Sequence, residues 1–155
     1  MDNQTYDKYW HVAKPLMQQA LTSIRDLLTR ELPEGRYSVG EIYEAGDIER
    51  QLNVDVFTQK GLCGLSFEFV LTDGEENGAD EGVGVLLRLV GYNALALGQY
   101  APGAYTEGAF TLDEGEVTQR IEALDVSEAA SHALTELRTN ETLRREIASA
   151  EAEMD

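Results

Sequence analysis

"QLNVDVFTQKGLCGLSFEFVLT", residues 51–72, is the stretch that decides the fold. It contains two runs in which apolar residues occupy every second position: Leu52, Val54 and Val56, and then Leu65, Phe67, Phe69 and Leu71. A period of two is typical of a strand with one buried face. The segment Gln59-Lys60-Gly61 between the runs is suited to a turn. The stretch therefore predicts an antiparallel β-hairpin.

The sequence on either side extends this sheet. Residues 36–46 alternate weakly, and residues 82–92, "GVGVLLRLVGY", are continuously apolar, as in a buried central strand. Residues 93–105 are ambiguous apart from a turn at Pro102-Gly103. Residues 108–124 are interpreted as two strands around Asp113-Glu114-Gly115, although the second half of this segment also fits a helix.

An apolar stripe predicts a long helix at the N-terminus. Its members recur at alternating spacings of four and three residues: Tyr6, Trp10, Ala13, Met17, Ala20, Ile24 and Leu27. Leu16, Leu21 and Leu28 widen the stripe. Two interpretations are open: the stripe packs on the protein's own sheet, which we favour, or it forms a dimerising coiled coil. Pro15 predicts either a kink or the start of a second helix within this segment.

The C-terminal part is expected to be helical. Asp125 followed by Glu128 is similar to a capping box, and Asn140 can cap a last helix. His132 falls between these caps and is expected at a helix surface or boundary. Residues 1–155 are thus predicted to form one α+β domain: a long N-terminal helix, an antiparallel sheet of about five or six strands, and C-terminal helices. Residues 140–155, which are polar and alanine-rich, are expected to be a loosely attached terminal helix.

Charge is the most unusual property of the chain. Twenty-nine acids against twelve bases give a net charge of −17. Residues 1–32 are balanced, whereas residues 61–125 contain twelve acids and two bases. Such a chain is repelled by nucleic acid and by anionic membranes and is attracted to basic protein surfaces. Solubility or adaptation to high salt would also produce an acidic chain.

Three observations favour a cytoplasmic location. Cys63 is the single cysteine, so no intrachain disulfide can form, which fits a reducing compartment. The first residues lack the basic and apolar regions of a signal peptide. The most apolar segment, residues 83–98, is interrupted by Arg88 and by glycines and is too short to span a bilayer.

The acidic stretch "TDGEENGADEGVG", residues 72–84, invites comparison with an EF-hand calcium loop. Asp73, Glu75 and Asn77 occupy positions one, three and five of that loop, and Gly78 occupies position six. Position twelve, which should be a bidentate glutamate, is Gly84. We therefore expect no EF-hand metal site and interpret the stretch as an acidic hairpin connection. A calcium-binding hairpin of another kind remains an alternative.

No catalytic pattern is complete. Asp55 and Glu68 on facing strands would suit a metal-dependent nuclease, but Val70 stands where that chemistry needs a lysine. Cys63 has no histidine that the sequence places beside it as a base. Leu87 replaces the third glycine of a dinucleotide fingerprint. The expectation is a protein that is not an enzyme and has no cofactor or metal.

The distributed acids lead to the functional hypothesis. Carboxylates two residues apart on a strand, or one turn apart on a helix, lie about 5–7 Å from one another and can imitate a run of phosphates. The expected partner-binding residues are Glu41, Glu44, Asp73, Glu75, Glu76, Asp80, Glu81, Asp113, Glu114 and Glu116. The expected partner is a protein with a basic, nucleic-acid-binding surface, with no direct contact to nucleic acid or membrane.

Size, acidity and the lack of a catalytic motif make the chain similar to phage or mobile-element inhibitors of CRISPR effectors and restriction systems, although no motif carries this similarity. The alternative is an acidic homodimeric chaperone for secretion or assembly, which would use the helical stripe for dimerisation and exposed apolar strand surface for its client. An ordinary acidic domain with a calcium-binding hairpin is the third hypothesis.

Overall fold

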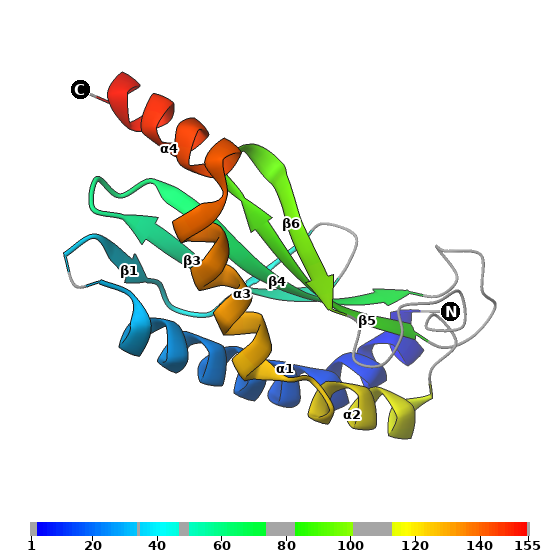
Figure 1. The fold of residues 1–155 in the computed structure, drawn as a ribbon. Coiled ribbons are helices and arrows are strands. Elements are labelled where there is room, and N and C mark those ends of the chain that lie inside the picture. Colours follow the sequence, from blue (N-terminus) through cyan, green and yellow to red (C-terminus); the bar gives the residue numbers. More distant parts are fainter. Residues whose placement is uncertain (1–2, 34, 47–49, 74–82, 101–112, 155) are drawn as a thin grey trace.

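The structure, a computed structural model, describes residues 3–33, 35–46, 50–73, 83–100 and 113–154. It confirms the predicted α+β fold, with a long N-terminal helix, an antiparallel sheet and C-terminal helices (Figure 1). The strands are β1 (Tyr37–Val39), β2 (Tyr43–Ala45), β3 (Arg50–Thr58), β4 (Cys63–Asp73), β5 (Val83–Gly91) and β6 (Leu95–Tyr100). The helices are α1 (Asn3–Glu31), α2 (Glu114–Glu122), α3 (Val126–Thr139) and α4 (Glu141–Glu153), and a short 3₁₀ turn, η2, spans Tyr92–Ala94.

The predicted hairpin of residues 51–72 is formed by β3 and β4, and β4 lies in the middle of the sheet. The strand order is β1-β3-β4-β5-β6. Strand β2 also pairs with β3, so that β1 and β2 lie along opposite ends of the same edge of β3. Val54 pairs with Phe67, and Phe67 pairs with Leu89, so that these three side chains share one face. Helices α1, α2 and α3 cover this face, where Val54, Phe67 and Leu89 are fully buried (Figure 1).

Helix α1 is continuous through Pro15, so the predicted start of a second helix at this residue is not found. Proline removes the hydrogen bond to the carbonyl four residues earlier, which belongs to His11. Pro15 and His11 are both exposed, so this carbonyl can be hydrated by water instead. The proline is tolerated because it lies on the outer side of the helix.

The apolar stripe of α1 packs on the protein's own sheet, which is the interpretation that we favoured. Its fully or nearly fully buried members are Tyr6, Ala13, Met17, Leu21, Ile24 and Leu28. These positions advance by about 3.7 residues per turn, as in a straight helix, rather than the 3.5 of a coiled-coil seam.

The dimerisation interpretation requires correction at these positions. The stripe predicted for it contains Trp10, Ala20 and Leu27, which lie beside the buried line and are only partly buried. Tyr6, Ala13, Met17 and Ile24 of the predicted stripe are occupied inside the monomer, so they offer no surface to a second copy.

Residues 114–122 form helix α2, which is the alternative that the sequence leaves open for the second half of this segment, rather than the favoured strand. Asp113 caps α2: its Oδ1 accepts a hydrogen bond from the amide of Glu116 at 2.8 Å, and the Glu116 carboxylate accepts the Asp113 amide at 3.5 Å. Val117 and Ile121, four residues apart, are both buried. The reciprocal cap therefore defines the helix start where we expected a hairpin turn; residues 108–112 of that segment lie outside the described residues.

Helix α4 is seated on the sheet by two small residues. A Cβ at Gly91 would lie 2.7 Å from Cδ1 of Leu143, and a Cβ at Gly64 would lie 3.3 Å from Cδ1 of Ile147. Leu143 is fully buried and Ile147 is 8% exposed. The helix expected to be loosely attached thus contacts the sheet through Leu143 and Ile147 in its first two turns, whereas the residues between them are exposed.

Candidate functional site

The structure divides the predicted partner-binding residues among three places. Glu41 and Glu44 lie beside α1, at the sheet edge that β1 and β2 form. The Glu41 side chain is 90% exposed and pairs with Nη2 of Arg25 at 3.1 Å, and Glu44 forms an ion pair with Lys14. Exposed pairs of this kind contribute little stability, but they partly neutralise both carboxylates.

Asp73 is the last residue of β4, and its Cα partner is Val83, the first residue of β5. The predicted partner-binding residues Glu75, Glu76, Asp80 and Glu81 lie between these two positions and outside the described residues, as does the interior of the calcium-like loop. Within the described part of the chain, no group of three histidine, cysteine or acidic side chains could hold a metal ion.

The third group, Asp113, Glu114 and Glu116, forms the exposed start of α2. The carboxylates of Asp113 and Glu116 take part in the helix cap, whereas Glu114 makes no capping bond. Figure 1 shows the start of α2, the end of β4 and the start of β5 together at the end of the molecule where α1 begins. Asp73 and the 113–116 group therefore share one end, which we call the acidic end, although the second group is a helix start instead of a hairpin.

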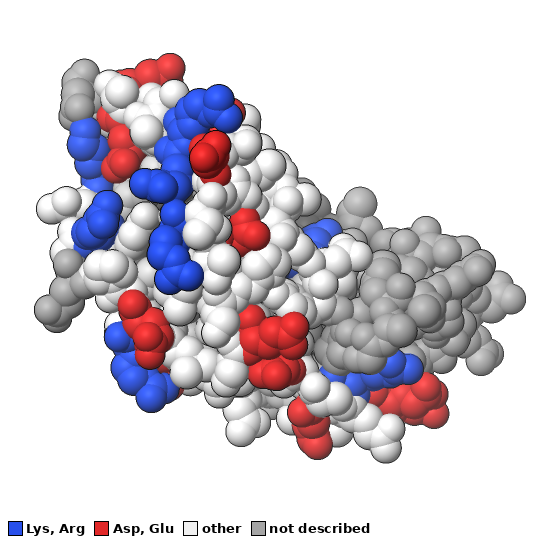
Figure 2. All heavy atoms as spheres, in the orientation of Figure 1, with Lys and Arg blue, Asp and Glu red and all other residues white. Residues whose placement is uncertain are grey.

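Basic side chains gather at the opposite end of the molecule. Figure 2 shows Lys and Arg side chains over α4, the end of α3 and the end of α1. Six of the twelve bases belong to this region: Arg30, Arg36, Lys60, Arg138, Arg144 and Arg145. Helix α4 also carries acids, so this end is near neutral, and the negative excess belongs to the rest of the molecule.

A chain of polar side chains lies on the sheet face that α1, α2 and α3 do not cover. Asp55 and Ser66 are Cα partners on β3 and β4, and the Ser66 hydroxyl donates to Oδ1 of Asp55 at 2.6 Å. The Tyr43 hydroxyl donates to Oδ2 of the same carboxylate at 2.8 Å. Sγ of Cys63 lies 3.4 Å from the Ser66 hydroxyl. Asp55 thus accepts hydrogen bonds from two neighbouring strands and ties β2 to β4.

This arrangement does not activate the cysteine. Burial raises the pKa of the Cys63 thiol above its ordinary value, and the Asp55 carboxylate raises it further, although the hydrogen bond with Ser66 lowers it. A thiol with a raised pKa remains protonated at neutral pH and is a weak nucleophile. Glu68, the second acid of the nuclease comparison, pairs with Asn53 in register and forms an ion pair with Arg88 at 3.2 Å.

A second polar cluster joins β6 to α3 and α4. The Tyr100 hydroxyl hydrogen-bonds to Nδ1 of His132, and Nε2 of His132 lies 3.1 Å from a carboxylate oxygen of Glu136. Burial, followed by the carboxylates of Glu128 and Glu136, raises the pKa of Tyr100 to about 12. The Tyr100 hydroxyl is therefore protonated at neutral pH.

His132 is accommodated because β6 has a glycine beneath it. A Cβ at Gly98 would lie 2.6 Å from Cε1 of His132. The residue expected at a helix surface or boundary is half-buried in this position. The four-residue spacing between His132 and Glu136 on a helix is a sequence signal that could have predicted their contact. Nothing in the sequence indicates that Tyr100 and Gly98 of β6 contact His132.

No protein-family model matches this chain, and neither a curated protein nor a solved structure does. None of the helices in the described ranges has the length and apolar character needed to cross a membrane.

Proposed function

We propose that this protein acts in the cytoplasm by binding a basic protein surface through its acidic end, in competition with nucleic acid. The observation that supports the proposal is the separation of charge along the molecule. Half of the bases lie at the end formed by α4 and the ends of α1 and α3, whereas the start of α2 and the end of β4 contribute acids at the other end. Acidic residues that served only solubility would not need to be separated from the bases along the molecule.

The chemistry of the acidic end suits a surface that binds phosphates. Glu114 and Glu116 are exposed in the first turn of α2, beside the capping carboxylate of Asp113. The sequence between Asp73 and Val83 adds four acids and no base. Carboxylates at such close spacing attract the lysines and arginines that otherwise bind a nucleic-acid backbone. Most specifically, we propose that the protein is an inhibitor that occupies the nucleic-acid-binding site of a CRISPR effector or restriction enzyme.

The chaperone alternative has less support. The side chains expected to form its dimer interface are largely buried in the monomer. Among the residues that the structure describes, the exposed large hydrophobic side chains are Tyr43 and Met154, which lie far apart in the sequence and form no broad client surface.

The decisive experiment compares two variants with equal change in charge. In the first, Glu75, Glu76, Asp80 and Glu81 are replaced by the corresponding amides; in the second, Glu141, Glu146, Glu151 and Glu153 of α4 are replaced by glutamine. Each immobilised protein is used to capture partners from host lysate over a salt series, with and without competing duplex DNA. The affinity for each partner so identified is then measured with the purified proteins.

We expect the wild-type protein to retain nucleic-acid-binding proteins that salt and DNA displace. The first variant should bind them at least about tenfold more weakly, and the second should differ from the wild type by less than about twofold. Equal losses in both variants, or retention that is insensitive to salt and DNA, would show that the acidity serves general solubility.

A further inference from the structure

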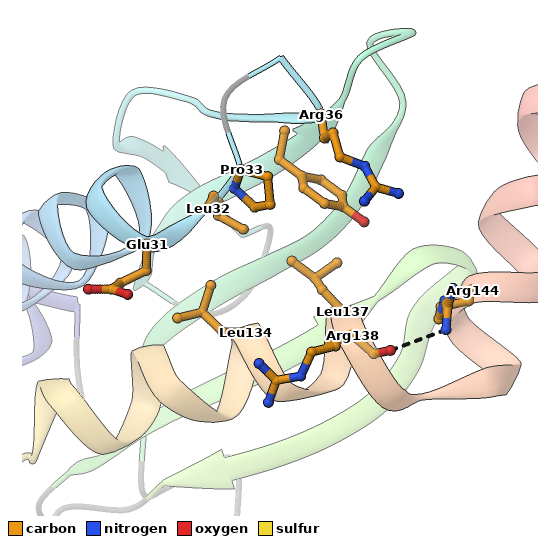
Figure 3. Close-up of a pocket in the computed structure, with 9 residues that line it drawn as sticks. Glu31, Leu32, Pro33, Arg36, Leu134, Leu137, Arg138 and Arg144 are labelled. Atoms are coloured by element: carbon orange, nitrogen blue, oxygen red, sulfur yellow. Dashed lines mark hydrogen bonds between the residues drawn. The ribbon is translucent and has the colours of Figure 1, made fainter.

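A groove of about 330 Å³ lies at the end of the molecule opposite the acidic end, between the end of α1, β1 and the α3–α4 junction. Its floor is apolar and consists of Leu32, Pro33, Tyr37, Leu134 and Leu137. Figure 3 shows three arginine side chains, Arg36, Arg138 and Arg144, around this floor. The groove thus combines an apolar base with several guanidinium groups in a chain of net charge −17.

The three arginines come from separate segments that the fold holds together. Arg36 lies in the turn before β1, Arg138 in the last turn of α3, and Arg144 in the beginning of α4. Asn140 fixes the junction between these helices, because its Oδ1 accepts the Leu143 amide at 2.9 Å while its Nδ2 donates to Glu136 at 2.7 Å. The relative positions of Arg138 and Arg144 are therefore set by the cap that Asn140 forms.

Ordinary structural roles account for only part of this positive charge. Arg138 lies at a helix C-terminus, where a base is favourable, and Nη1 of Arg144 donates to the Arg138 carbonyl at 3.2 Å. Arg144 also lies at the N-terminal end of α4, where the helix dipole disfavours a cation. Arg36 lies in a turn and not at a helix terminus, so a helix dipole does not account for its position. No ion pair joins Arg36 or Arg138 to an acid within the described ranges.

One acid also lines the groove. Glu31 is exposed at the end of α1, and Figure 3 shows its carboxylate pointing away from the guanidinium groups. The Glu31 carboxylate therefore does not neutralise the guanidinium groups that line the groove. Guanidinium groups bind planar carboxylates and phosphates through paired hydrogen bonds, and leucine and tyrosine side chains bind an apolar body. The volume lies within the range of small-molecule sites.

We propose that this groove binds a small organic anion, a phosphate ester or carboxylate attached to an apolar, planar body. Arg36 and Arg138 hold the oxyanion, and Tyr37, Leu134 and Leu137 contact the body. Such a ligand has charge opposite to that expected for the partner of the acidic end, so the groove is a separate site. Its occupation does not depend on the function proposed above.

The test uses four probes of graded chemistry. Binding of 1-naphthyl phosphate, 1-naphthoate, 1-naphthol and inorganic phosphate to the full chain is measured by titration calorimetry and by amide chemical shifts. At least one of the two naphthyl anions should bind ten times or more tightly than both 1-naphthol and inorganic phosphate, with shifts concentrated at the groove. The better of the two identifies the oxyanion as phosphate or carboxylate.

Variants distinguish the groove from general attraction to arginine. Arg36→Gln and Arg138→Gln should each weaken the better probe at least fivefold. Arg30→Gln and Arg145→Gln remove neighbouring charges that do not line the groove and should change binding by less than twofold. Unchanged circular dichroism and melting temperature verify folding. Equal losses in all four variants, or naphthyl anions that bind no more tightly than 1-naphthol, would overturn the proposal.

Discussion

The two faces of the sheet use alternate residues of the same strands for different purposes. On the face covered by α1, α2 and α3, Val54, Phe67 and Leu89 are fully buried in the hydrophobic core. On the other face, Asp55 and Ser66 form a hydrogen-bonded chain between strands. The comparison shows that the core holds the sheet to its helices, whereas the polar face holds strand to strand. The two contributions should differ in size, and mutations can separate them.

The largest effect is expected for Phe67→Ala on the covered face. Phe67 is fully buried at the centre of the sheet, so its truncation should lower the free energy of unfolding by about 3–5 kcal/mol through lost burial and an unfilled cavity. Chemical denaturation monitored by circular dichroism measures this change. Glu68→Ala, one residue further along β4 on the other face, is the matched control and should cost about 1 kcal/mol or less. Similar losses at both positions would refute the proposed difference between the faces.

A smaller loss is expected for Asp55→Ala on the polar face. The substitution leaves the Tyr43 and Ser66 hydroxyls without their acceptor, and it should cost about 1–2 kcal/mol because both donors can partly regain water. A double-mutant cycle with Ser66→Ala measures the coupling by denaturation. We expect the double variant to lose less than the sum of the two single losses. Strict additivity would show that the hydrogen bond contributes nothing to stability.

The smallest effect is expected at high pH, from the tyrosine cluster at the margin of the covered face. The folded protein raises the pKa of Tyr100 from 10.0 to about 12, so it favours the protonated hydroxyl. This stabilisation is fully present below pH 10 and is lost as the pH rises from 10 to 12. The difference in unfolding free energy between the wild type and Tyr100→Phe should therefore shift against the wild type over that interval. A difference that is constant with pH would contradict the raised pKa.

The sheet and the long helix could be predicted because their periods are encoded locally. Leu52, Val54 and Val56 alternate, so the buried face of their strand follows from the spacing alone. In the helix, the spacing also predicts Met17 and Ile24 as buried, but it places Leu21 and Leu28 beside the predicted stripe, although both are fully buried. The start of α2 could also have been read from Asp113 and Glu116, three residues apart. The residues Asp113-Glu114-Gly115 favour a turn equally well, so the sequence alone does not distinguish a turn from a helix start.

The candidate sites were less predictable, because they depend on contacts between distant segments. Nothing local relates Arg36 to Arg138, which the fold places in one groove. Nor does the sequence place Gly98 under His132. The net charge of −17 also draws attention away from a local cluster of bases. Arg138, Arg144 and Arg145 lie within eight residues of one another, although the chain has only twelve bases.

The shared cap between α3 and α4 has a mechanical consequence. Asn140 ends one helix and begins the next, so no linker absorbs motion between them. The thirteen residues of α4 form a lever of about 20 Å, because a helix rises about 1.5 Å per residue. A rotation of about 10° at the Asn140 backbone would displace the tip by about 3–4 Å while moving Arg144 only slightly. Any change at the base of this lever is therefore amplified at the C-terminal end of the protein.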